Sequence, residues 1–261
     1  MQPPYTITPE ILQLVSDVSQ RMGAVNASFL TRQSPELRKR NRIKTIQASL
    51  AVEGNTLSVN QVTAIIENKR VLGPAKDIRE VENAIEVYGN LGKFKPLRER
   101  SLLAAHRLLL RGLLTDAGRY RSKGAGIVKG KQLTHLAPPA ANIPGLMKDL
   151  FRYLEKAKDP LLIKSCVFHY ELEFIHPFTD GNGRMGRLWQ TLLLMNEFPA
   201  AEFLPFETLI GKKQQQYYKA LAASDKKGTS TPFIHFMLTI LREALDELLQ
   251  ERAGPVLPVD R

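Results

Sequence analysis

Helix signals recur along most of the chain, and they constrain its fold more than any other feature of the sequence. The segment from Thr8 to Glu10 combines a capping hydroxyl, a proline at the first helical position and an acid in the first turn. The segment from Ser34 to Glu36 repeats this start, and Ser58 opens a capping box with the glutamine three residues later. Because apolar residues follow each start at helical spacing, the sequence predicts an all-α fold.

The first helix is expected to begin at Thr8. Further helices are expected over 34–54, 58–66, 77–91, 99–110, 144–156, 160–175, 187–194, 212–223 and 232–249. The helical pattern breaks over 112–144, which is punctuated by glycines and closed by two prolines. Two short runs around a glycine-containing turn within 126–135 predict a small β-hairpin there, and a plain long loop is the alternative.

The overall composition limits the class of protein. The chain has 261 residues, a formal charge of +11 and one cysteine, so it has no internal disulfide and no multi-cysteine zinc site. No apolar run approaches the ~20 residues that a membrane helix needs, and the N-terminus does not read as a secretory signal. We therefore expect a cytoplasmic protein without a membrane partner. The charge suits nucleic acid, nucleotides or an acidic partner, and a solvated basic surface is the alternative.

One segment between two apolar helical runs stands apart, HPFTDGNGRMGR at residues 176–187. Pro177 disfavours a helical conformation for the residue before it, so the first helix should end at His176. The Gly-Asn-Gly turn at 181–183 leaves backbone N–H groups exposed at the start of the next helix, where the helix dipole adds positive charge. The sequence therefore predicts an anion site at this helix N-terminus.

Four side chains extend this anion site. Arg184 and Arg187 are three residues apart, so they share a face of the first turn and should lean towards the same anion. Each can bind phosphate oxygens as a bidentate donor. Asp180 offers one hard oxygen beside the phosphates, which suits Mg²⁺. His176 supplies a titratable base with an unperturbed pKa of ~6.5. The segment thus predicts a site for several phosphates, a metal ion and a base.

Other chemistries fit the sequence less well. A P-loop needs Gly-x-x-x-x-Gly-Lys-[Ser/Thr], and residues 126–131 lack both the spacing and the hydroxyl. Cys166 lies in an apolar helical run, which indicates a buried thiol rather than the nucleophile of a protease. His169 and His176 are two helical turns apart, but Pro177 disturbs the second one, which disfavours a zinc site. A basic DNA-binding regulator and a pseudo-enzyme that only binds nucleotide remain competing classes.

The same segment resembles the signature of the Fic (Fido) family, His-x-Phe-x-[Asp/Glu]-Gly-Asn-Gly-Arg-x-x-Arg, at every specified position. The similarity extends to residues 115–147, which resemble the family's flap hairpin and the segment after it. This resemblance implies a Fic-type helical bundle with a small β-hairpin flap. It divides the chain into an N-terminal helical region (1–95), a catalytic core (96–250) and a tail (251–261).

The resemblance also implies an activity, the transfer of AMP from ATP to a Ser, Thr or Tyr hydroxyl of a target protein. His176 is then the general base, Asp180 holds Mg²⁺ on the phosphates and Phe178 anchors the loop in the core. The residues implied for ATP binding are Gly181, Asn182, Gly183, Arg184, Arg187, Tyr217 and Tyr218. For the two tyrosines, core aromatics are the alternative. Glycine at 183 favours AMP transfer over the phosphorylation by a relative that carries a bulkier residue there.

A second motif concerns regulation. Ser49 and Glu53 are four residues apart on one helix face, and Gly54 fits a helix C-cap. Ser49-x-x-x-Glu53-Gly54 resembles the family's inhibitory motif, [Ser/Thr]-x-x-x-Glu-[Gly/Asn]. The resemblance implies that Glu53 pairs with Arg187 and inhibits the enzyme, and it leaves open that Glu53 also serves in AMP removal. A solvated surface carboxylate is the alternative.

The expected partners rest on the same resemblance. The flap residues Ile127, Val128 and Lys129 are expected to clamp the target by strand pairing, which needs little side-chain specificity. ATP and a protein with a modifiable hydroxyl are the expected partners. Self-modification and a homodimer stay open, and nucleic acid is not expected, because the chain after residue 232 is too short for a winged helix.

Overall fold

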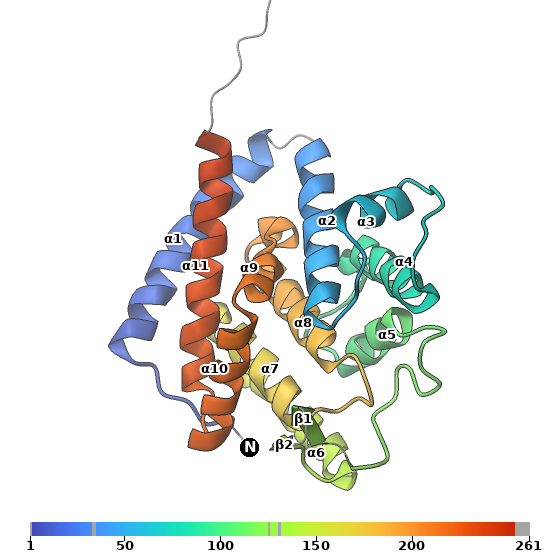
Figure 1. The fold of residues 1–261 in the computed structure, drawn as a ribbon. Helices are drawn as coiled ribbons and strands as arrows, with labels where there is room; N and C mark the ends of the chain where they lie inside the picture. The colour runs from blue at the N-terminus through green and yellow to red at the C-terminus, as the bar shows by residue number, and fades with distance from the viewer. Residues whose placement is uncertain (1, 33–34, 125, 130–131, 254–261) are drawn as a thin grey trace, which may run out of the picture.

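The computed structural model describes residues 2–32, 35–124, 126–129 and 132–253. Within these ranges the protein is almost entirely helical, which confirms the predicted all-α class (Figure 1). The helices are α1 (Pro9–Arg32), α2 (Pro35–Val52), α3 (Val59–Ile66), α4 (Ala75–Gly89), α5 (Glu99–Leu109), α6 (Ile143–Lys156), α7 (Leu161–Ile175), α8 (Asn182–Met195), α9 (Phe206–Lys212), α10 (Gln214–Lys227) and α11 (Thr231–Ala253), with short 3₁₀ turns at Leu91–Lys93, Ala140–Asn142 and Pro199–Phe203.

The predicted helix starts are confirmed where side chains cap them. Thr8 Oγ1 accepts a hydrogen bond from Ile11 N at 3.3 Å, and both bonds of the capping box between Ser58 and Gln61 are present. The prediction of one helix over 212–223 is wrong, because the backbone of Lys213 leaves the helical region and separates α9 from α10. The helix predicted over 187–194 begins earlier, at Asn182, directly after the motif glycine.

The first and last helices pack side by side (Figure 1). Thr6 N donates to Thr231 Oγ1 at 2.9 Å, and Arg21 pairs with Asp246 at 2.6 Å. Both contacts join residues that are 225 positions apart, so α1 and α11 run parallel. The N-terminal helices are therefore part of the same packed body as the C-terminal one. Within the described ranges, none of the helices has both the length and the hydropathy to cross a bilayer.

The helices α7 and α8 form an antiparallel pair at the centre of the molecule (Figure 1). Both are buried on nearly all sides, which explains why α7 reads as apolar all round instead of amphipathic. The fully buried rings of Phe168, Phe178 and Trp189 fill the space around this pair. The motif of residues 176–187 covers the turn that joins α7 to α8 and the first residues of α8, and α2 packs against α8.

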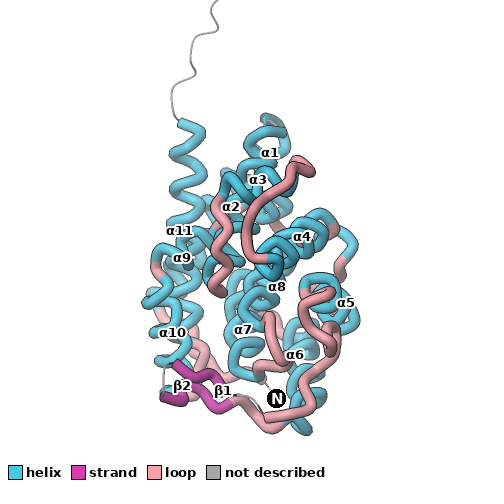
Figure 2. The backbone as a smooth tube through the Cα atoms, turned by 45° about the vertical axis from the view of Figure 1, so that its right-hand side comes forward, coloured by secondary structure: helices cyan, strands magenta, loops and turns pink. Residues whose placement is uncertain are grey.

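Two short strands, β1 (Gly126–Lys129) and β2 (Gln132–Leu136), lie between α5 and α6 in the chain and pair antiparallel. Figure 2 shows them at one end of the molecule, beside α10. The pairing shifts register between Ile127 and Val128. The backbone of Ile127, Val128 and Lys129 is described, and their side chains lie outside the described part. Most of the tail predicted over 251–261 also lies outside it, since α11 runs to Ala253.

Candidate active site

The turn between α7 and α8 carries His176. Its backbone is left-handed, with φ of 48° and ψ of 58°, so the helix ends there as the following proline predicts. His176 N still donates to Leu172 O at 3.0 Å. A left-handed conformation is uncommon for a residue other than glycine, so the surrounding contacts must hold it. His176 is half-buried.

The rest of the turn is closed by Asn182. Its side chain donates to Phe178 O and accepts from Phe178 N, both at 2.9 Å. Phe178 is fully buried and stacks on the ring of His106 with centroids 3.7 Å apart, which confirms the predicted anchoring of the loop. The amide side chain of Asn182 is therefore used to fix the turn, while its backbone begins α8.

The N-terminus of α8 has the geometry of an anion site. Gly181 caps the helix in the left-handed region, with φ of 85°. The first-turn N–H groups of Asn182, Gly183 and Arg184 have no acceptor within a helix, and they carry the positive end of its dipole. A Cβ built on Gly183 would lie 2.3 Å from Glu53 Oε1. The carboxylate of Glu53 therefore occupies the space directly over Gly183.

Glu53 reaches this position from the end of α2. Gly54 adopts φ of 92° and Asn55 N donates to Leu50 O at 3.1 Å, which confirms the predicted glycine C-cap. The helix thus stops one residue before Glu53. The side chain of Glu53 is 35% exposed, so the carboxylate lies at the edge of the site and not in the core.

Arg187 is fully buried and turns towards α2. Its Nη2 donates to Glu53 Oε1 at 2.8 Å and to Ser49 O at 2.9 Å, and its Nε donates to Ser49 Oγ at 3.1 Å. Burial by itself lowers the pKa of Arg187, but the charge of Glu53 and its hydrogen bond outweigh burial and raise that pKa. The structure therefore brings Ser49, Glu53 and Arg187 into one contact.

Arg184 has different partners. Its Nη1 donates to Glu80 Oε1 at 3.1 Å and its Nη2 to Asp180 Oδ1 at 3.0 Å. The two arginines therefore contact different carboxylates and not one shared anion, as their spacing had suggested. The reason is tertiary, because the buried carboxylate of Glu80 comes from α4.

Asp180 has the environment of an ionised carboxylate. Its Oδ1 also accepts from Gly181 N at 2.6 Å, and its side chain is 53% exposed. Burial raises the pKa of Asp180, but the charge of Arg184 and these hydrogen bonds lower it below its usual value overall. No group of three His, Cys, Asp or Glu side chains that could hold a metal occurs among the described residues. The donor set thus fits only an ion completed by phosphate oxygens and water, as Mg²⁺ often is.

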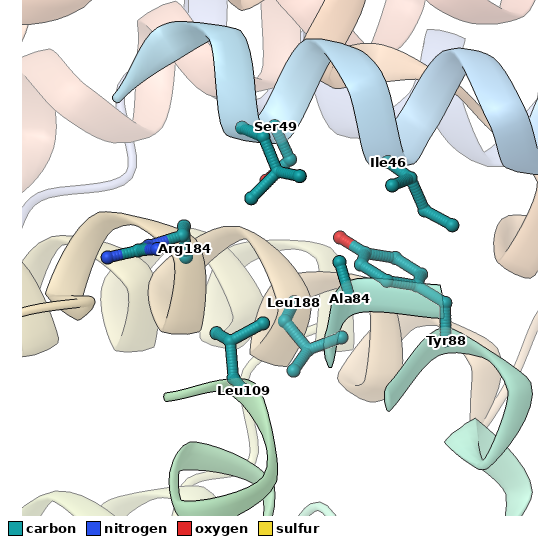
Figure 3. A pocket seen from close by; sticks show the side chains of 8 residues that line it. Ile46, Ser49, Ala84, Tyr88, Leu109, Arg184 and Leu188 are labelled. Carbon is teal, nitrogen blue, oxygen red and sulfur yellow. The ribbon is translucent and has the colours of Figure 1, made fainter. Parts of the chain in front are cut away.

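The space beneath Ser49 is almost filled. A cavity of about 10 Å³ lies between α2, α4 and α8, which is room for one water molecule. Figure 3 shows Tyr88 reaching into it from α4, with Ser49 above and Leu188 on the opposite side. Nucleotide pockets measure roughly 300–1,000 Å³, so this cavity indicates close packing of α2 on α8 and not a ligand site.

The two tyrosines of α10 differ. Tyr217 is 1% exposed, and its hydroxyl lies 3.1 Å from His169 Nε2, so it is a core aromatic in this structure. Tyr218 is 40% exposed. Burial raises the pKa of Tyr218, and the charge of Glu53 raises it further.

The alternative catalytic groups are buried and engaged. Cys166 is fully buried, and burial raises the pKa of its thiol to about 12, so it is not a reactive nucleophile. His169 is also buried. Its two ring nitrogens contact Gln190 Oε1 at 2.7 Å and the hydroxyl of Tyr217, and burial lowers its pKa to about 3. Both ring nitrogens of His169 are thus occupied, which argues against a zinc ligand.

Three residues around the motif do not follow from the motif itself. Glu80 holds Arg184, His106 supports Phe178, and Arg121 contacts the backbone of His176. Two of them carried a signal in the sequence, because Glu80 and His106 lie on the apolar faces of α4 and α5. A charged or titratable side chain on a buried face needs a tertiary partner. The position of Arg121 in an irregular segment gave no such signal.

Comparison with known proteins adds an independent line of information. The sequence profile of the Fic/DOC family matches residues 96–194. The crystal structure of a Fic family protein from Desulfovibrio desulfuricans G20 superposes with a TM-score of 0.93 at 50% identity, covering 98% of this chain and 79% of that one.

Curated relatives match more distantly. Protein adenylyltransferase Fic of Nematostella vectensis is 26% identical over 259 residues, which is 92% of this chain and 58% of the relative. Protein adenylyltransferase fic-1 of Caenorhabditis elegans is 30% identical over 203 residues, 72% of this chain and 37% of the relative. The chain thus spans between about a third and three-fifths of the length of these curated relatives.

Proposed function

This chain belongs to the Fic/DOC family, and from that premise we propose that it transfers AMP from ATP to a hydroxyl group of a target protein. The observation that carries the proposal is the turn between α7 and α8, which sets a histidine beside an anion site at the start of a helix. The relatives named protein adenylyltransferases support the same reaction class.

In this reaction, His176 acts as general base. It accepts the proton of a Ser, Thr or Tyr hydroxyl while the hydroxyl oxygen bonds to the α-phosphorus of ATP, and the bond to pyrophosphate breaks. A positioned base of this kind contributes ~10²–10⁴-fold. The first-turn N–H groups of Asn182 and Gly183, with Arg184 and Arg187, stabilise the charge that develops on the phosphate oxygens.

Asp180 is the residue proposed to hold Mg²⁺. Its carboxylate has a lowered pKa, is half-exposed and lies next to the anion site. Bound there, the ion would supply positive charge that offsets the negative charge of the phosphates. For the adenine base, the exposed ring of Tyr218 is the better candidate of the two tyrosines, because Tyr217 is part of the core.

We further propose that the contact between Glu53 and Arg187 inhibits the reaction. The pair removes Arg187 from the phosphates, and the carboxylate lies over Gly183, where a negatively charged phosphate would meet it. ATP would then bind in an unproductive pose. A role of Glu53 in positioning water for AMP removal is a second proposal, supported by its partial exposure at the same site.

The target is proposed to bind at the strand pair. The described residues form a sheet of two strands, so each strand has an outer edge. Such an edge can accept an extended peptide through main-chain hydrogen bonds. This proposal concerns the backbone of Ile127, Val128 and Lys129. Self-modification and a homodimer remain predictions.

The test is incorporation of label from ATP labelled at the α-phosphate into the protein itself, with Mg²⁺ present. We expect a low signal from the wild type and strong labelling by Glu53→Gly, because the variant frees Arg187. Adding His176→Ala to Glu53→Gly should abolish labelling and leave ATP binding unchanged. Equal labelling of wild type and Glu53→Gly, with matched folding, would refute inhibition. Labelling that survives His176→Ala would refute the general base.

The competing class of DNA-binding regulator can be tested with the same preparation. Thermal shift in physiological salt should show stabilisation by ATP with Mg²⁺ and none by duplex DNA. The reverse result would favour a nucleic-acid partner.

A further inference from the structure

Arg121 is a buried arginine whose hydrogen bonds all go to backbone carbonyls in the described part of the chain. The residue is 4% exposed and lies in the irregular segment between α5 and β1. Its Nε donates to His176 O at 2.7 Å, its Nη1 to Lys123 O at 2.7 Å and its Nη2 to Pro138 O at 2.7 Å. A longer bond of 3.4 Å joins Nη2 to Ile175 O.

These acceptors belong to two separate parts of the protein. Ile175 and His176 end α7 and include the proposed base. Lys123 lies just before β1 and Pro138 just after β2, so they are the two stems of the strand pair. The backbone of Arg121 adds a third link, because its N–H donates to Pro177 O at 2.9 Å. One residue therefore joins both stems of the hairpin to the backbone of His176.

The guanidinium group is suited to this arrangement. Its donors lie in one rigid plane, so the three carbonyl oxygens bonded at 2.7 Å have a fixed relative geometry. Hydrogen bonds from a charged donor are also stronger than those between neutral groups. A lysine ammonium in the same place would offer a compact charge on a flexible stem and could not hold all three carbonyls in that plane.

Both segments that Arg121 joins, the backbone at His176 and the strand pair, need contacts that keep them in place. His176 is in the left-handed region, which a residue other than glycine occupies only when its surroundings impose it. An isolated two-stranded hairpin is marginally stable and has no fixed position unless it packs against the body of the protein. The bonds of Arg121 restrain both.

We propose that Arg121 is a positioning residue that holds the hairpin in register with His176, so that a target strand paired to the hairpin presents its hydroxyl at the imidazole. The inference rests on the proposed AMP transfer and adds the residue that couples target binding to the base. A misplacement of about 1 Å between base and hydroxyl can cost ~10²-fold in rate. Arg121 acts through the backbone and does not touch substrate.

The first experiment compares two reactions of one active site, in the Glu53→Gly background. AMP transfer to protein needs the hairpin, whereas hydrolysis of ATP to AMP and pyrophosphate uses water and needs no target strand. For Arg121→Gln and Arg121→Lys, we expect the ratio of protein transfer to hydrolysis to fall about tenfold or more. The affinity for ATP should stay within about twofold, because Arg121 does not contact the anion site.

The matched control is Arg119→Gln, which removes the same charge from an exposed side chain two residues away. In this variant, the ratio of protein transfer to hydrolysis should equal that of the Glu53→Gly parent. If transfer and hydrolysis fall in equal proportion in the Arg121 variants, Arg121 serves stability alone and the coupling is refuted. An unchanged ratio with unchanged rates refutes it as well.

The second experiment does not depend on activity. Amide hydrogen exchange should show that Arg121→Gln increases exchange in residues 122–138 and 172–180 together, while α11 keeps its protection. Faster exchange in only one of the two segments, or in neither, would overturn the coupling. If the Glu53→Gly parent itself transfers no AMP, the proposed function fails, and the exchange result still decides whether Arg121 couples the two segments.

Discussion

Among single residues, Gly186 shows how closely the two central helices approach. A Cβ built on Gly186 would lie 2.5 Å from Cδ2 of His169 and 3.0 Å from its Nε2. His169 is fully buried and cannot move away, because Gln190 and Tyr217 hold both of its ring nitrogens. The absence of a side chain at 186 therefore sets the distance between α7 and α8, and with it the geometry of the turn that carries His176.

Gly186→Ala is expected to destabilise the fold by about 1–3 kcal/mol, because overpacking forces a rigid neighbour to shift. Thermal unfolding followed by circular dichroism should show a Tm lower by several degrees. Gly145→Ala is the control, since a Cβ there has nothing within 4 Å and its helix should gain a little stability. A Tm for Gly186→Ala equal to that of the wild type would contradict the close approach.

Among the helices, α2 is the element whose docking controls the site. Its C-terminal end is tied to α10, since Gln214 Nε2 donates to Val52 O at 2.9 Å. It is tied to α4 as well, since Asn55 Nδ2 donates to Glu80 Oε2 at 2.8 Å. The contact between Glu53 and Arg187 is therefore only one of several that keep α2 in place. Removing one of the other contacts should also let the end of α2 leave the site, but in a smaller fraction of molecules than Glu53→Gly does.

Gln214→Ala is expected to raise self-labelling above the wild type but below Glu53→Gly. Loss of one hydrogen bond is worth about 0.5–1.5 kcal/mol, which corresponds to roughly two- to tenfold more of the undocked helix. Label incorporation from α-labelled ATP measures the effect. Gln215→Ala, which changes the exposed neighbour in the same way, should behave as the wild type. Equal labelling by the two variants would mean that this bond does not hold α2.

For the protein as a whole, buried titratable groups make stability depend on pH, and Glu207 and His169 are shifted far in opposite directions. Burial raises the pKa of Glu207 to about 8, although a hydrogen bond to its own backbone and the charge of Arg187 oppose the shift. Burial lowers the pKa of His169 to about 3. Glu207 is raised above its unfolded value, so the folded state binds its proton more tightly and loses stability as pH rises from about 4.5 to about 8. The lowered pKa of His169 has the opposite effect, so its contribution to stability increases as pH rises from about 3 to about 6.5.

The contribution of His169 ends at about pH 6.5. Burial and the charge of Asp225 raise the pKa of Glu171 to about 7, so the effect of Glu207 should be clearest between pH 7 and 8. There the wild type should lose stability by up to about 1.4 kcal/mol per pH unit. Glu207→Gln should lose markedly less and exceed the wild type at pH 8. Urea unfolding at pH 7 and pH 8 measures this, with exposed Glu247→Gln as control. The same pH dependence in wild type and Glu207→Gln would show that Glu207 is ionised throughout.

Much of the local structure was predictable because its causes are local. The caps at Thr8 and Ser58, the glycine end of α2 and the end of α7 at His176 each depend on residues within a few positions of one another. Helical periodicity also identified the buried pair around the motif. The division of 206–227 into α9 and α10 was missed, because the break at Lys213 falls two residues after the nearest glycine, Gly211, and is followed by no proline.

The sequence by itself determined where most of the helices lie and that a turn with a histidine and a Gly-Asn-Gly motif joins two of them, because hydrogen-bond capping and side-chain spacing act over a few residues. Only the tertiary structure decided the partners of Arg184 and Arg121. Arg184 meets Glu80 across 104 residues, and Arg121 meets His176 across 55. Those choices depend on how helices pack, and a buried charge bonds to whatever group the packing brings within about 3 Å of it.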